Sequence, residues 1–338
     1  MFGMPLATLV FQSSAGGLGL VRRSRSLHSR VSQRKDPHRR NQTMSDFLNA
    51  YSIQTWLESC PQGYLEDTEY GHAPGQKEPE LILENPTLRQ ESIQSTVQLV
   101  VGERAALAAS SGLINSAPDY PSKRFLATQT LDEARHVEIF TQRLYDLGVK
   151  KDELEDVISQ YANPHLVKFA EVLLEKVDKG DFLAGVVGQN IVLEGMAFSV
   201  FEMMQASNVE LNPKFAKTLS GTIADERRHV GFGENRIGSL LQEHPEKKPE
   251  IEQMQKDMTY HMLATFADSF RGNAPAMEET RKIAQEAIPD QKHQVWHGTD
   301  LGSADPAELE NVLADTVLKE FKTRLGRIGL EYQEPAKP

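Results

Sequence analysis

The chain has 338 residues, of which 39% are hydrophobic and 25% charged, a composition typical of a soluble globular protein with a sizeable core. Its formal net charge is −11; residues 1–43 carry a net +7, which leaves −18 on residues 44–338. Such an acidic body repels phosphate backbones and argues against nucleic acid as a partner. The single cysteine, Cys60, excludes an internal disulfide framework, and no run reaches the roughly 20 uninterrupted apolar residues of a membrane span.

Residues 1–43 form a basic, Ser-rich leader with eight Arg or Lys residues and a single acid, Asp36. This composition is typical of a transit peptide, which would direct the protein to mitochondria. The alternative is that translation starts at Met44, or that the leader is disordered. On that alternative the protein is cytoplasmic, and this is the location that we expect.

Residues 44–88 are punctuated by Pro and Gly and predict an irregular N-terminal wrap with one short helix. From about Leu88 onward, long runs with a 3.6-residue apolar period predict α-helices. No β pattern of comparable length appears, so the predicted class is all-α. The predicted helices are 88–116, 121–147, 164–178, 181–207, 212–243, 248–271 and 305–327.

Four of these helices are long and fall into two pairs, each joined by a short turn. The connection between the pairs is longer and contains the helix at 164–178. Two antiparallel hairpins linked by a crossover are the ferritin-like form of the four-helix bundle. We therefore predict such a bundle over residues 89–245, with its crossover helix, and extra C-terminal helices within residues 246–338.

The pattern Asp-Glu-x-Arg-His occurs twice, at residues 132–136 and 225–229, each time on a long predicted helix. A spacing of three places Glu and His on one helix face, so that both can reach one ion. A third Glu-x-x-His, Glu69 to His72, lies in a Gly/Pro-rich segment that would not align the two side chains, and we discount it. The alternative is ordinary surface ion pairing. The metal ligands predicted from the doubled pattern are Glu133, His136, Glu226 and His229.

The Asp and Arg residues of the same pattern predict a supporting layer. A metal-bound imidazole needs its other N–H held by a carboxylate. Asp132 and Asp225 are the candidates, each for the histidine of the opposite helix. Arg135 and Arg228 would then neutralise these aspartates.

Two further carboxylates stand at matching offsets. Glu103 lies 30 residues before Glu133, and Glu194 lies 32 residues before Glu226. Both acids lie in apolar stretches, where an ionised carboxylate is costly to bury unless a cation compensates it. Four carboxylates and two imidazoles are the ligand set of di-iron and di-manganese bundles. Because such a site usually serves oxygen chemistry, we predict two iron ions, with manganese or a mixed Fe/Mn pair left open.

These residues resemble the ferritin-like, ribonucleotide-reductase-like di-iron carboxylate proteins. The doubled pattern looks most like the hydroxylase subunits of bacterial multicomponent monooxygenases, over residues 89–245. The resemblance implies reductive O₂ activation at the metal pair and oxidation of an organic substrate bound beside it. It also implies an electron-donating ferredoxin or reductase, and we expect a homodimer.

Three positions depart from relatives of this kind. Phe198 replaces the threonine that the hydroxylases keep one turn after the third glutamate, which puts the usual hydroxylation mechanism in doubt. Phe140 replaces the radical tyrosine of ribonucleotide reductase small subunits. Thr222, one turn before Glu226, replaces the third histidine of arylamine N-oxygenases. We predict Glu103, Glu194 and Thr222 as the catalytic residues.

The predicted substrate pocket follows from positions three or four residues from each ligand and from the small-residue run 108–112. This run could equally reflect tight helix packing, and the amides of Gln129 and Asn190 could equally bond to backbone. The predicted pocket residues are Ala106, Leu107, Ser110, Gln129, Phe140, Asn190, Phe198 and Ile223.

The predicted function is that of a non-haem di-iron oxidase or monooxygenase, which activates O₂ to oxidise a small organic or lipid-like substrate. The alternative is a ferroxidase or iron-handling ferritin-like protein without an organic substrate. Ferritin-type cages are shorter single bundles, so the extra C-terminal helices argue against that alternative. A metal-free helical scaffold is disfavoured by the doubled pattern.

Overall fold

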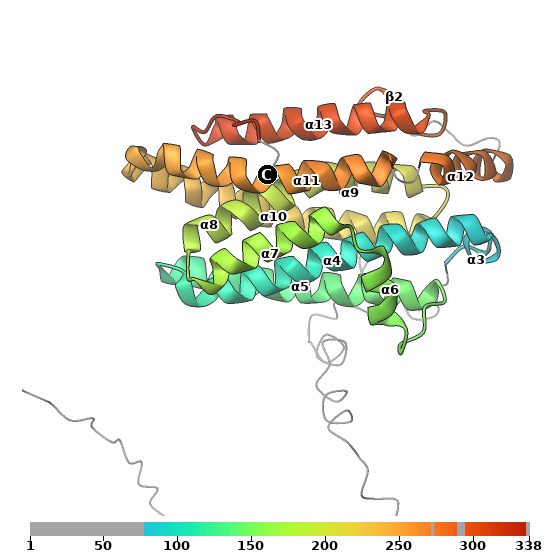
Figure 1. Ribbon diagram of the computed structural model, residues 1–338, viewed down its shortest axis with the longest axis horizontal. Coiled ribbons are helices and arrows are strands. Elements are labelled where there is room, and N and C mark those ends of the chain that lie inside the picture. The colour runs from blue at the N-terminus through green and yellow to red at the C-terminus, as the bar shows by residue number, and fades with distance from the viewer. Residues whose placement is uncertain (1–77, 272–273, 289–294, 336–338) are drawn as a thin grey trace, which may run out of the picture. The chain divides into compact units, whose positions relative to one another are not determined.

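The computed structural model describes residues 78–271, 274–288 and 295–335, and its centre is a bundle of long helices (Figure 1). One hairpin pairs α4 (Pro86–Ser116) with α5 (Tyr120–Asp146), and the other pairs α9 (Glu194–Asn208) with α10 (Pro213–Glu243). The prediction of an all-α, ferritin-like bundle is confirmed. The leader, residues 44–77 of the predicted wrap and the discounted Glu69–His72 pair lie outside the described residues.

The long helices start where the sequence supplies a cap. Asn85 accepts the backbone N–H groups of Thr87 and Leu88 at the start of α4, and Asp119 accepts that of Ser122 at the start of α5. Asn212 caps α10 in the same way. A proline follows within two residues of each cap, where its fixed φ suits the first helical turn and its missing N–H costs nothing.

The crossover between the hairpins contains α6 (Leu154–Tyr161) and α7 (Pro164–Asp178). The helix predicted at 164–178 is confirmed, whereas α6 was not predicted. Gln98 on α4 ties the crossover to the bundle, because its amide nitrogen donates to the carbonyl of Tyr161 at 2.6 Å and its amide oxygen accepts the N–H of Asn163 at 2.9 Å. The helix α7 packs against both α4 and α11.

The single helix predicted at 181–207 is wrong in one respect. It is divided into α8 (Phe182–Val186), a π-helix η2 (Val187–Leu193) and α9, and the N–H of Glu194 donates to the carbonyl of Gln189, five residues earlier. A π turn inserts an extra residue without changing the apolar composition, so the sequence pattern carries little sign of it. Such turns are rare and occur frequently at functional sites.

The C-terminal part covers the bundle. The helix α11 packs against α7 and η2, and α13 packs against α9; in Figure 1, α13 lies along one edge and α5 along the other. The helices predicted at 248–271 and 305–327 are present, while α12 and a two-stranded hairpin were not predicted. The remaining bounds are α3 (Glu80–Glu84), η3 (Pro245–Lys247), α11 (Lys248–Arg271), α12 (Ala274–Ala287), β1 (Val295–Trp296), β2 (Thr299–Asp300) and α13 (Pro306–Arg327).

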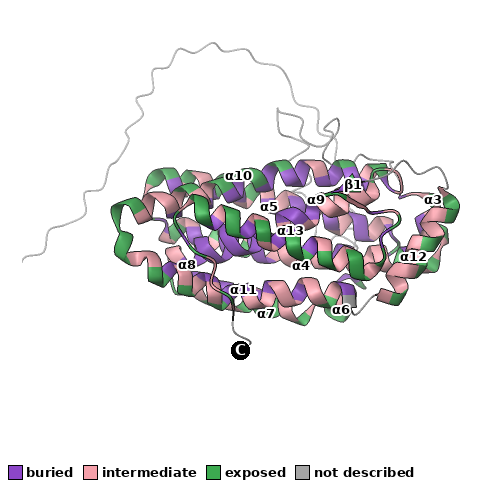
Figure 2. Cartoon of the chain, turned by 90° about the horizontal axis from the view of Figure 1, so that it is seen from above, coloured by how far each residue is buried: buried purple, intermediate pink, exposed green. Residues whose placement is uncertain are grey.

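Two stretches, Pro86–Ser116 and Phe182–Asn208, are long and apolar enough to cross a membrane by length and composition alone. In the most apolar window of each, 50% and 83% of the residues, respectively, are buried inside the protein. Figure 2 shows the buried residues gathered on the inner faces of the helices. Burial in the bundle is a sufficient reason for the apolar character of both stretches.

Candidate metal centre

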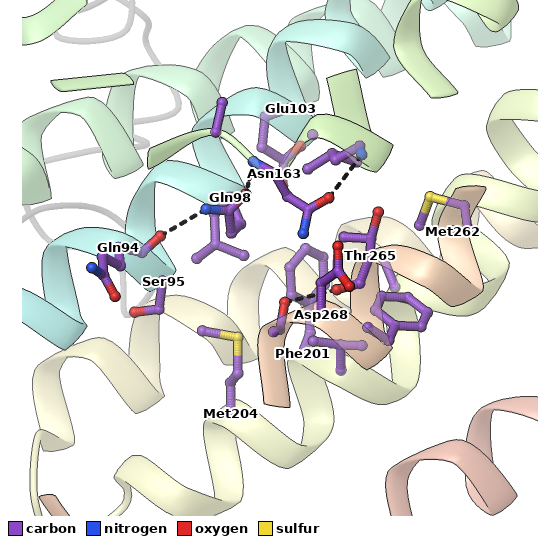
Figure 3. Close-up of a pocket in the computed structure, with 18 of the residues that line it drawn as sticks. Gln94, Ser95, Gln98, Glu103, Asn163, Phe201, Met204, Met262, Thr265 and Asp268 are labelled. Carbon is purple, nitrogen blue, oxygen red and sulfur yellow. Dashed lines mark hydrogen bonds between the residues drawn. The ribbon is translucent and has the colours of Figure 1, made fainter. Parts of the chain in front are cut away.

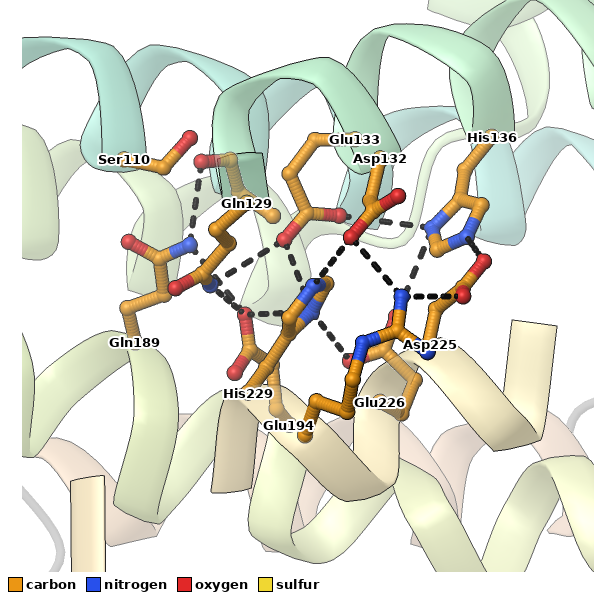
Figure 4. Close-up of polar contacts among 12 residues, drawn as sticks. Ser110, Gln129, Asp132, Glu133, His136, Gln189, Glu194, Asp225, Glu226 and His229 are labelled. Carbon is orange, nitrogen blue, oxygen red and sulfur yellow. Dashed lines mark hydrogen bonds and ion pairs between the residues drawn. The ribbon is translucent and has the colours of Figure 1, made fainter. Parts of the chain in front are cut away.

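Each of the four bundle helices places a glutamate in the core, and α5 and α10 each add a histidine. Figure 4 shows Glu133, Glu194 and Glu226 with the two histidines. All six side chains are buried, with at most 4% of their residue surface exposed. The structure thus brings together all of the predicted ligands. They are Glu103, Glu133, His136, Glu194, Glu226 and His229.

Two glutamates lie between the two histidines. Glu133 places Oε2 3.4 Å from Nδ1 of His136 and Oε1 3.3 Å from Nδ1 of His229. Glu226 places Oε1 and Oε2 3.4 Å from the same two nitrogens, respectively. Each carboxylate therefore offers one oxygen to each side of the centre, as a carboxylate that bridges two ions must.

The other two glutamates each face one histidine. Oε2 of Glu103 lies 3.3 Å from Nδ1 of His136, and Oε1 of Glu194 lies 3.9 Å from Nδ1 of His229. Ligand atoms of two groups lie within 4.8 Å of one another, which is close enough to surround a single ion in each group. The first group is Glu103, Glu133, His136 and Glu226, and the second is Glu133, Glu194 and His229.

The polar atoms of this cluster fit a pair of cations. Oε2 of Glu133, Oε2 of Glu226 and Nδ1 of His229 are buried and have no hydrogen-bond partner among the described residues. Unpaired buried polar atoms are costly, and buried charges need compensation. Two divalent ions would supply the missing partners and would balance four carboxylate charges. Oxygen and imidazole donors without thiolate suit iron and manganese.

Without metal, the cluster holds protons. Burial raises the pKa of Glu103 to about 8 and raises that of Glu194 well above its ordinary value. Burial opposes the charged form of His136, but the facing carboxylates, Glu103 first, outweigh it and raise the pKa to about 9. The pKa of His229 rises to about 12 in the same way, through Asp132 and Glu226. Metal binding must therefore displace protons from this site.

A carboxylate from the opposite helix holds each imidazole from behind. Nε2 of His136 lies 3.1 Å from Oδ2 of Asp225, and Nε2 of His229 lies 3.2 Å from Oδ2 of Asp132. These contacts turn Nδ1 of both rings toward the glutamates. An N–H held in this way fixes the tautomer and leaves the other nitrogen free for a metal.

Two arginines complete this outer layer. Arg135 forms an ion pair with Asp225 across the α5–α10 boundary, and Arg228 lies 3.1 Å from Asp132 and 2.5 Å from Asp225. The side chain of Arg228 is 55% exposed, whereas that of Arg135 is 14% exposed. The two arginines and two aspartates thus form a layer of ion pairs that covers the centre on the side of α5 and α10.

Three amides hold the carboxylate of Glu194. Gln129 donates to its Oε1 at 2.7 Å, Gln189 donates to the same oxygen at 3.1 Å, and Asn190 donates to Oε2 at 3.0 Å. The π-helix makes this possible, because i→i+5 bonding brings residues four and five positions before Glu194 onto its side of the helix. The close approach of α10 also needs Gly233, where an added Cβ would lie 2.6 Å from that of Asn190.

Gln189 is the residue that the sequence prediction missed. The sequence feature that could have identified Gln189 as a site residue is the amide pair Gln189-Asn190. This pair lies inside an otherwise apolar run just before the acid Glu194. Thr222, predicted to be catalytic, is buried, and its hydroxyl donates to the carbonyl of Thr218 at a long 3.5 Å. A catalytic role for Thr222 stays a prediction.

A cavity of about 600 Å³ adjoins the centre, and Glu103, Glu194 and Glu226 form part of its wall. Figure 3 shows Glu103 among the residues that line it. Of the eight predicted pocket residues, Ala106 alone lines it. The prediction took positions near all six ligands as pocket positions. The cavity, however, opens between α4 and α9 and not between α5 and α10. The seven predicted pocket residues that do not line this cavity are Leu107, Ser110, Gln129, Phe140, Asn190, Phe198 and Ile223, and their role at a substrate stays a prediction.

These seven residues have other surroundings. Phe140, Phe198 and Ile223 pack together in an apolar core cluster. Gln129 and Asn190 hold Glu194, as described above, and do not bond only to backbone, the alternative left open by the sequence. The hydroxyl of Ser110 donates to the carbonyl of Leu107.

The structure is similar to solved structures of proteins described as oxidases. One is "Protein 19 with aldehyde deformylating oxidase activity from Synechococcus", with a TM-score of 0.54 and 15% identity over 74% of this chain and 94% of that chain. Another is a variant of an R2-like ligand-binding oxidase with an aerobically reconstituted Mn/Fe cofactor, with a TM-score of 0.60 and 16% identity over 72% of this chain and 82% of that chain. The R2-like oxidase after photoconversion has a TM-score of 0.59.

No protein-family model matches the sequence, and no curated protein matches it. The three structural neighbours are not hydroxylase subunits of multicomponent monooxygenases, so that closer resemblance stays a prediction. Identities of 15–16% establish the arrangement of the helices and not the reaction. The chain shares a ferritin-like helical-bundle fold with these structures.

Proposed function

We propose that this protein is a di-metal oxidase that uses O₂ to oxidise an organic substrate bound in the cavity. The observation that carries this proposal is the position of the cavity, because three of the six predicted ligands form its inner wall. A protein that only stored or oxidised iron would have no need of a cavity of about 600 Å³ beside its metals. The oxidase activities named for the structural neighbours support the same class of reaction.

The bound metals would supply Lewis acidity and redox equivalents for the reduction of O₂. The residues of this chain then have separate tasks. Glu133 and Glu226, which each face both histidines, would help to hold both ions, while Glu103 and Glu194 would each help to hold one ion beside the cavity. Asp132 and Asp225 keep the imidazoles oriented, and the apolar cavity walls keep bulk water away from the reacting atoms.

The metal pair and the partners belong to the same proposal. The ligand set suits two irons, and the Mn/Fe cofactor of a structural neighbour supports a mixed pair as the second possibility. Two electrons per turnover would come from a ferredoxin or reductase. We also propose a homodimer.

The test starts from metal-free protein loaded anaerobically with Fe(II), or with Fe(II) and Mn(II) together. Metal analysis should give two ions per chain, and a single exposure to O₂ should consume oxygen in proportion to the loaded sites. Glu194→Ala should abolish oxygen consumption and leave the helical content intact. Glu243→Ala, at an exposed position of α10 outside the centre, is the control.

Two outcomes would contradict the proposal. The first is iron-supplied protein that retains no metal. The second is Glu194→Ala with the oxygen consumption of the unchanged protein. A ferroxidase would consume O₂ in proportion to added Fe(II) beyond two ions per chain, whereas the proposed oxidase would stop when the two sites are oxidised and would need an electron donor to continue.

A further inference from the structure

Among the described residues, a further group of side chains that could hold a metal ion lies where three separate elements meet. Its members are Glu202 on α9, His297 in the turn between β1 and β2, and Glu320 on α13. Both β1 and α13 pack against α9, and Figure 1 shows α13 and β2 at the same edge of the bundle. Glu202 lies eight residues after Glu194, about 12 Å farther along the helix, so this group is separate from the metal centre.

The three side chains are close together but do not bond to one another. One ligand atom of each lies within 4.8 Å of the other two. Among the described residues, no hydrogen bond or ion pair joins the imidazole of His297 to either carboxylate. Zinc bonds to nitrogen and oxygen of about 2.0–2.2 Å place neighbouring ligand atoms roughly 3.4 Å apart. A small movement of the three side chains would therefore enclose one ion.

The two carboxylates of this group repel each other. Burial raises the pKa of Glu202, and the negative charge of Glu320 raises it further. The imidazole of the group and the guanidinium groups of Arg227 and Arg324 act in the opposite direction. Both guanidinium groups, however, lie over the ring of Phe198, and the described residues include no ion pair between them and these carboxylates. A cation bound between the carboxylates would remove the repulsion.

The backbone of the β1–β2 turn places the imidazole in this group. His297 has a φ of +47° and Gly298 a φ of +86°, and the flanking residues Trp296 and Thr299 pair with each other. Two-residue turns with positive φ at both central positions favour Asn, Asp and Gly. A histidine rarely adopts this conformation. Local backbone preference therefore does not account for His297, whereas a role as a ligand does.

A surface pocket of about 450 Å³ gives ions access to the group. His297 and Glu320 line it together with other side chains of α13. Apart from the imidazole, its charged lining residues are three acids, Glu308, Asp315 and Glu320, and one base, Lys319. The excess of negative charge attracts cations. Glu202, which is half-buried, completes the group.

The donor atoms select the kind of cation. Calcium and magnesium prefer ligand sets made of oxygen alone, whereas an imidazole suits the divalent ions of the first transition row. Zinc accepts histidine and glutamate together, and with three protein ligands its fourth position goes to water. The pocket beside His297 and Glu320 has room for that water.

We propose that Glu202, His297 and Glu320 bind a third divalent transition-metal ion, with zinc as the preferred ion, which ties the β1–β2 turn and α13 to α9. The site lies outside the proposed oxidase chemistry and does not depend on it. Because His297 is exposed, the ion exchanges readily with solvent. A brief wash with a chelator should therefore empty this site while the buried centre keeps its two ions.

The first test is a calorimetric titration of zinc into the full chain, after the centre has been filled with iron and the protein has been washed. One Zn²⁺ should bind per chain. Mg²⁺ and Ca²⁺ should bind at least about tenfold more weakly, because they gain less from an imidazole. Absence of zinc binding, or binding of Ca²⁺ as tight as that of zinc, would overturn the proposal.

Variants of two ligands test which residues bind the ion. His297→Asn and Glu202→Gln should each weaken zinc binding more than about 100-fold, because even the loss of a residue that only supports a ligand costs 10–100-fold. Asparagine suits the left-handed turn, so the hairpin should keep its fold. Zinc binding that is unchanged in both variants would exclude this site.

The control separates a ligand site from a merely acidic surface. Asp315→Asn removes a charge from the same pocket at an exposed position of α13. It should change zinc affinity less than about threefold, because exposed charges are screened by salt. A loss as large as that in Glu202→Gln would show that the ion is held by the general negative charge of the pocket. His297→Asn should also keep both ions of the centre, and loss of one of them would show that the two sites are not separate.

Tryptophan fluorescence tests the position of the ion. The rings of Trp296 and His297 lie 4.5 Å apart between centroids, and Trp56→Phe leaves Trp296 as the only tryptophan of the chain. Paramagnetic Co²⁺ should quench this fluorescence up to one equivalent per chain, and zinc should prevent the quenching. Fluorescence that Co²⁺ leaves unchanged, or quenching that persists when His297→Asn is added, would place the ion elsewhere.

Discussion

The helix pairs α5–α10 and α4–α9 contribute to the centre in different ways. The α5–α10 side supplies both histidines and the two glutamates between them, and Asp132, Asp225 and two arginines close it. The α4–α9 side supplies Glu103 and Glu194 and opens into the cavity. We infer that one side holds the metals and that the other receives the substrate, so substitutions on the two sides should have different consequences.

The largest effect is expected for Glu133→Gln on the α5–α10 side. This carboxylate faces both histidines, so its loss removes one charge from both metal positions at once. Metal analysis should find less than half of the metal of the unchanged protein. Glu138→Gln, half-buried on the same helix, is the control. Full metal content in Glu133→Gln would show that this residue does not bridge the two positions.

A change of pH should act mainly through the metal-free state. The raised pKa values of His136, about 9, and Glu103, about 8, mean that the folded metal-free protein binds extra protons. The stability contributed by His136 is complete below pH 6.5 and is lost as the pH rises through 9; that contributed by Glu103 is complete below 4.5 and is lost as the pH rises through 8. Metal binding displaces the same protons and strengthens over this range.

The gap in melting temperature between Mn(II)-loaded and metal-free protein should therefore widen from pH 6 to pH 9. Thermal denaturation at several pH values, with and without metal, measures this gap. If on the order of two protons leave when the metals bind, the affinity rises about a hundredfold per pH unit. A gap that stays constant would mean that metal binding does not displace these protons.

A smaller effect is expected for Asp225→Asn, which keeps the shape of the side chain but removes the charge behind His136. Metal affinity or activity should fall about 10–100-fold, because the imidazole is less firmly oriented. Competition with a coloured chelator measures the affinity. Asp257→Asn, at an exposed position of α11, provides the control. A variant at Asp225 that matches the unchanged protein in both properties would remove Asp225 from the supporting layer.

The smallest effect is expected on the α4–α9 side, for Gln189→Met. This substitution removes one of three amide donors to Glu194 and costs about 1 kcal/mol in the free energy of unfolding. Metal content should stay normal, while oxygen consumption with substrate should fall severalfold as Glu194 gains freedom. Thermal denaturation and metal analysis separate the two effects. A loss of metal as large as that of Glu133→Gln would show that the two sides do not differ as proposed.

The sequence alone determined the features that follow from local periodicity. Helix boundaries near Asn85, Asp119 and Asn212 depend on caps and prolines within a few residues, and the facing of Glu and His depends only on a spacing of three. Glu103 and Glu194 were predicted from their similar separations, 30 and 32 residues, from the glutamate of the next long helix. The structure brings them to the centre because, in a hairpin of two long helices, residues about equally far from the turn lie opposite one another. For these reasons the six predicted ligands lie together in the fold.

Only the tertiary structure decided which side of the centre is open. The cavity is lined by residues of α4, α7, α9, α11 and α12, so its position depends on packing between residues far apart in the chain. The π-helix before Glu194 likewise changes which residues face the centre, although its sequence is as apolar as an ordinary helix. The six predicted ligands could be identified because their spacing is local, whereas the cavity and the amides that hold Glu194 depend on how the helices pack.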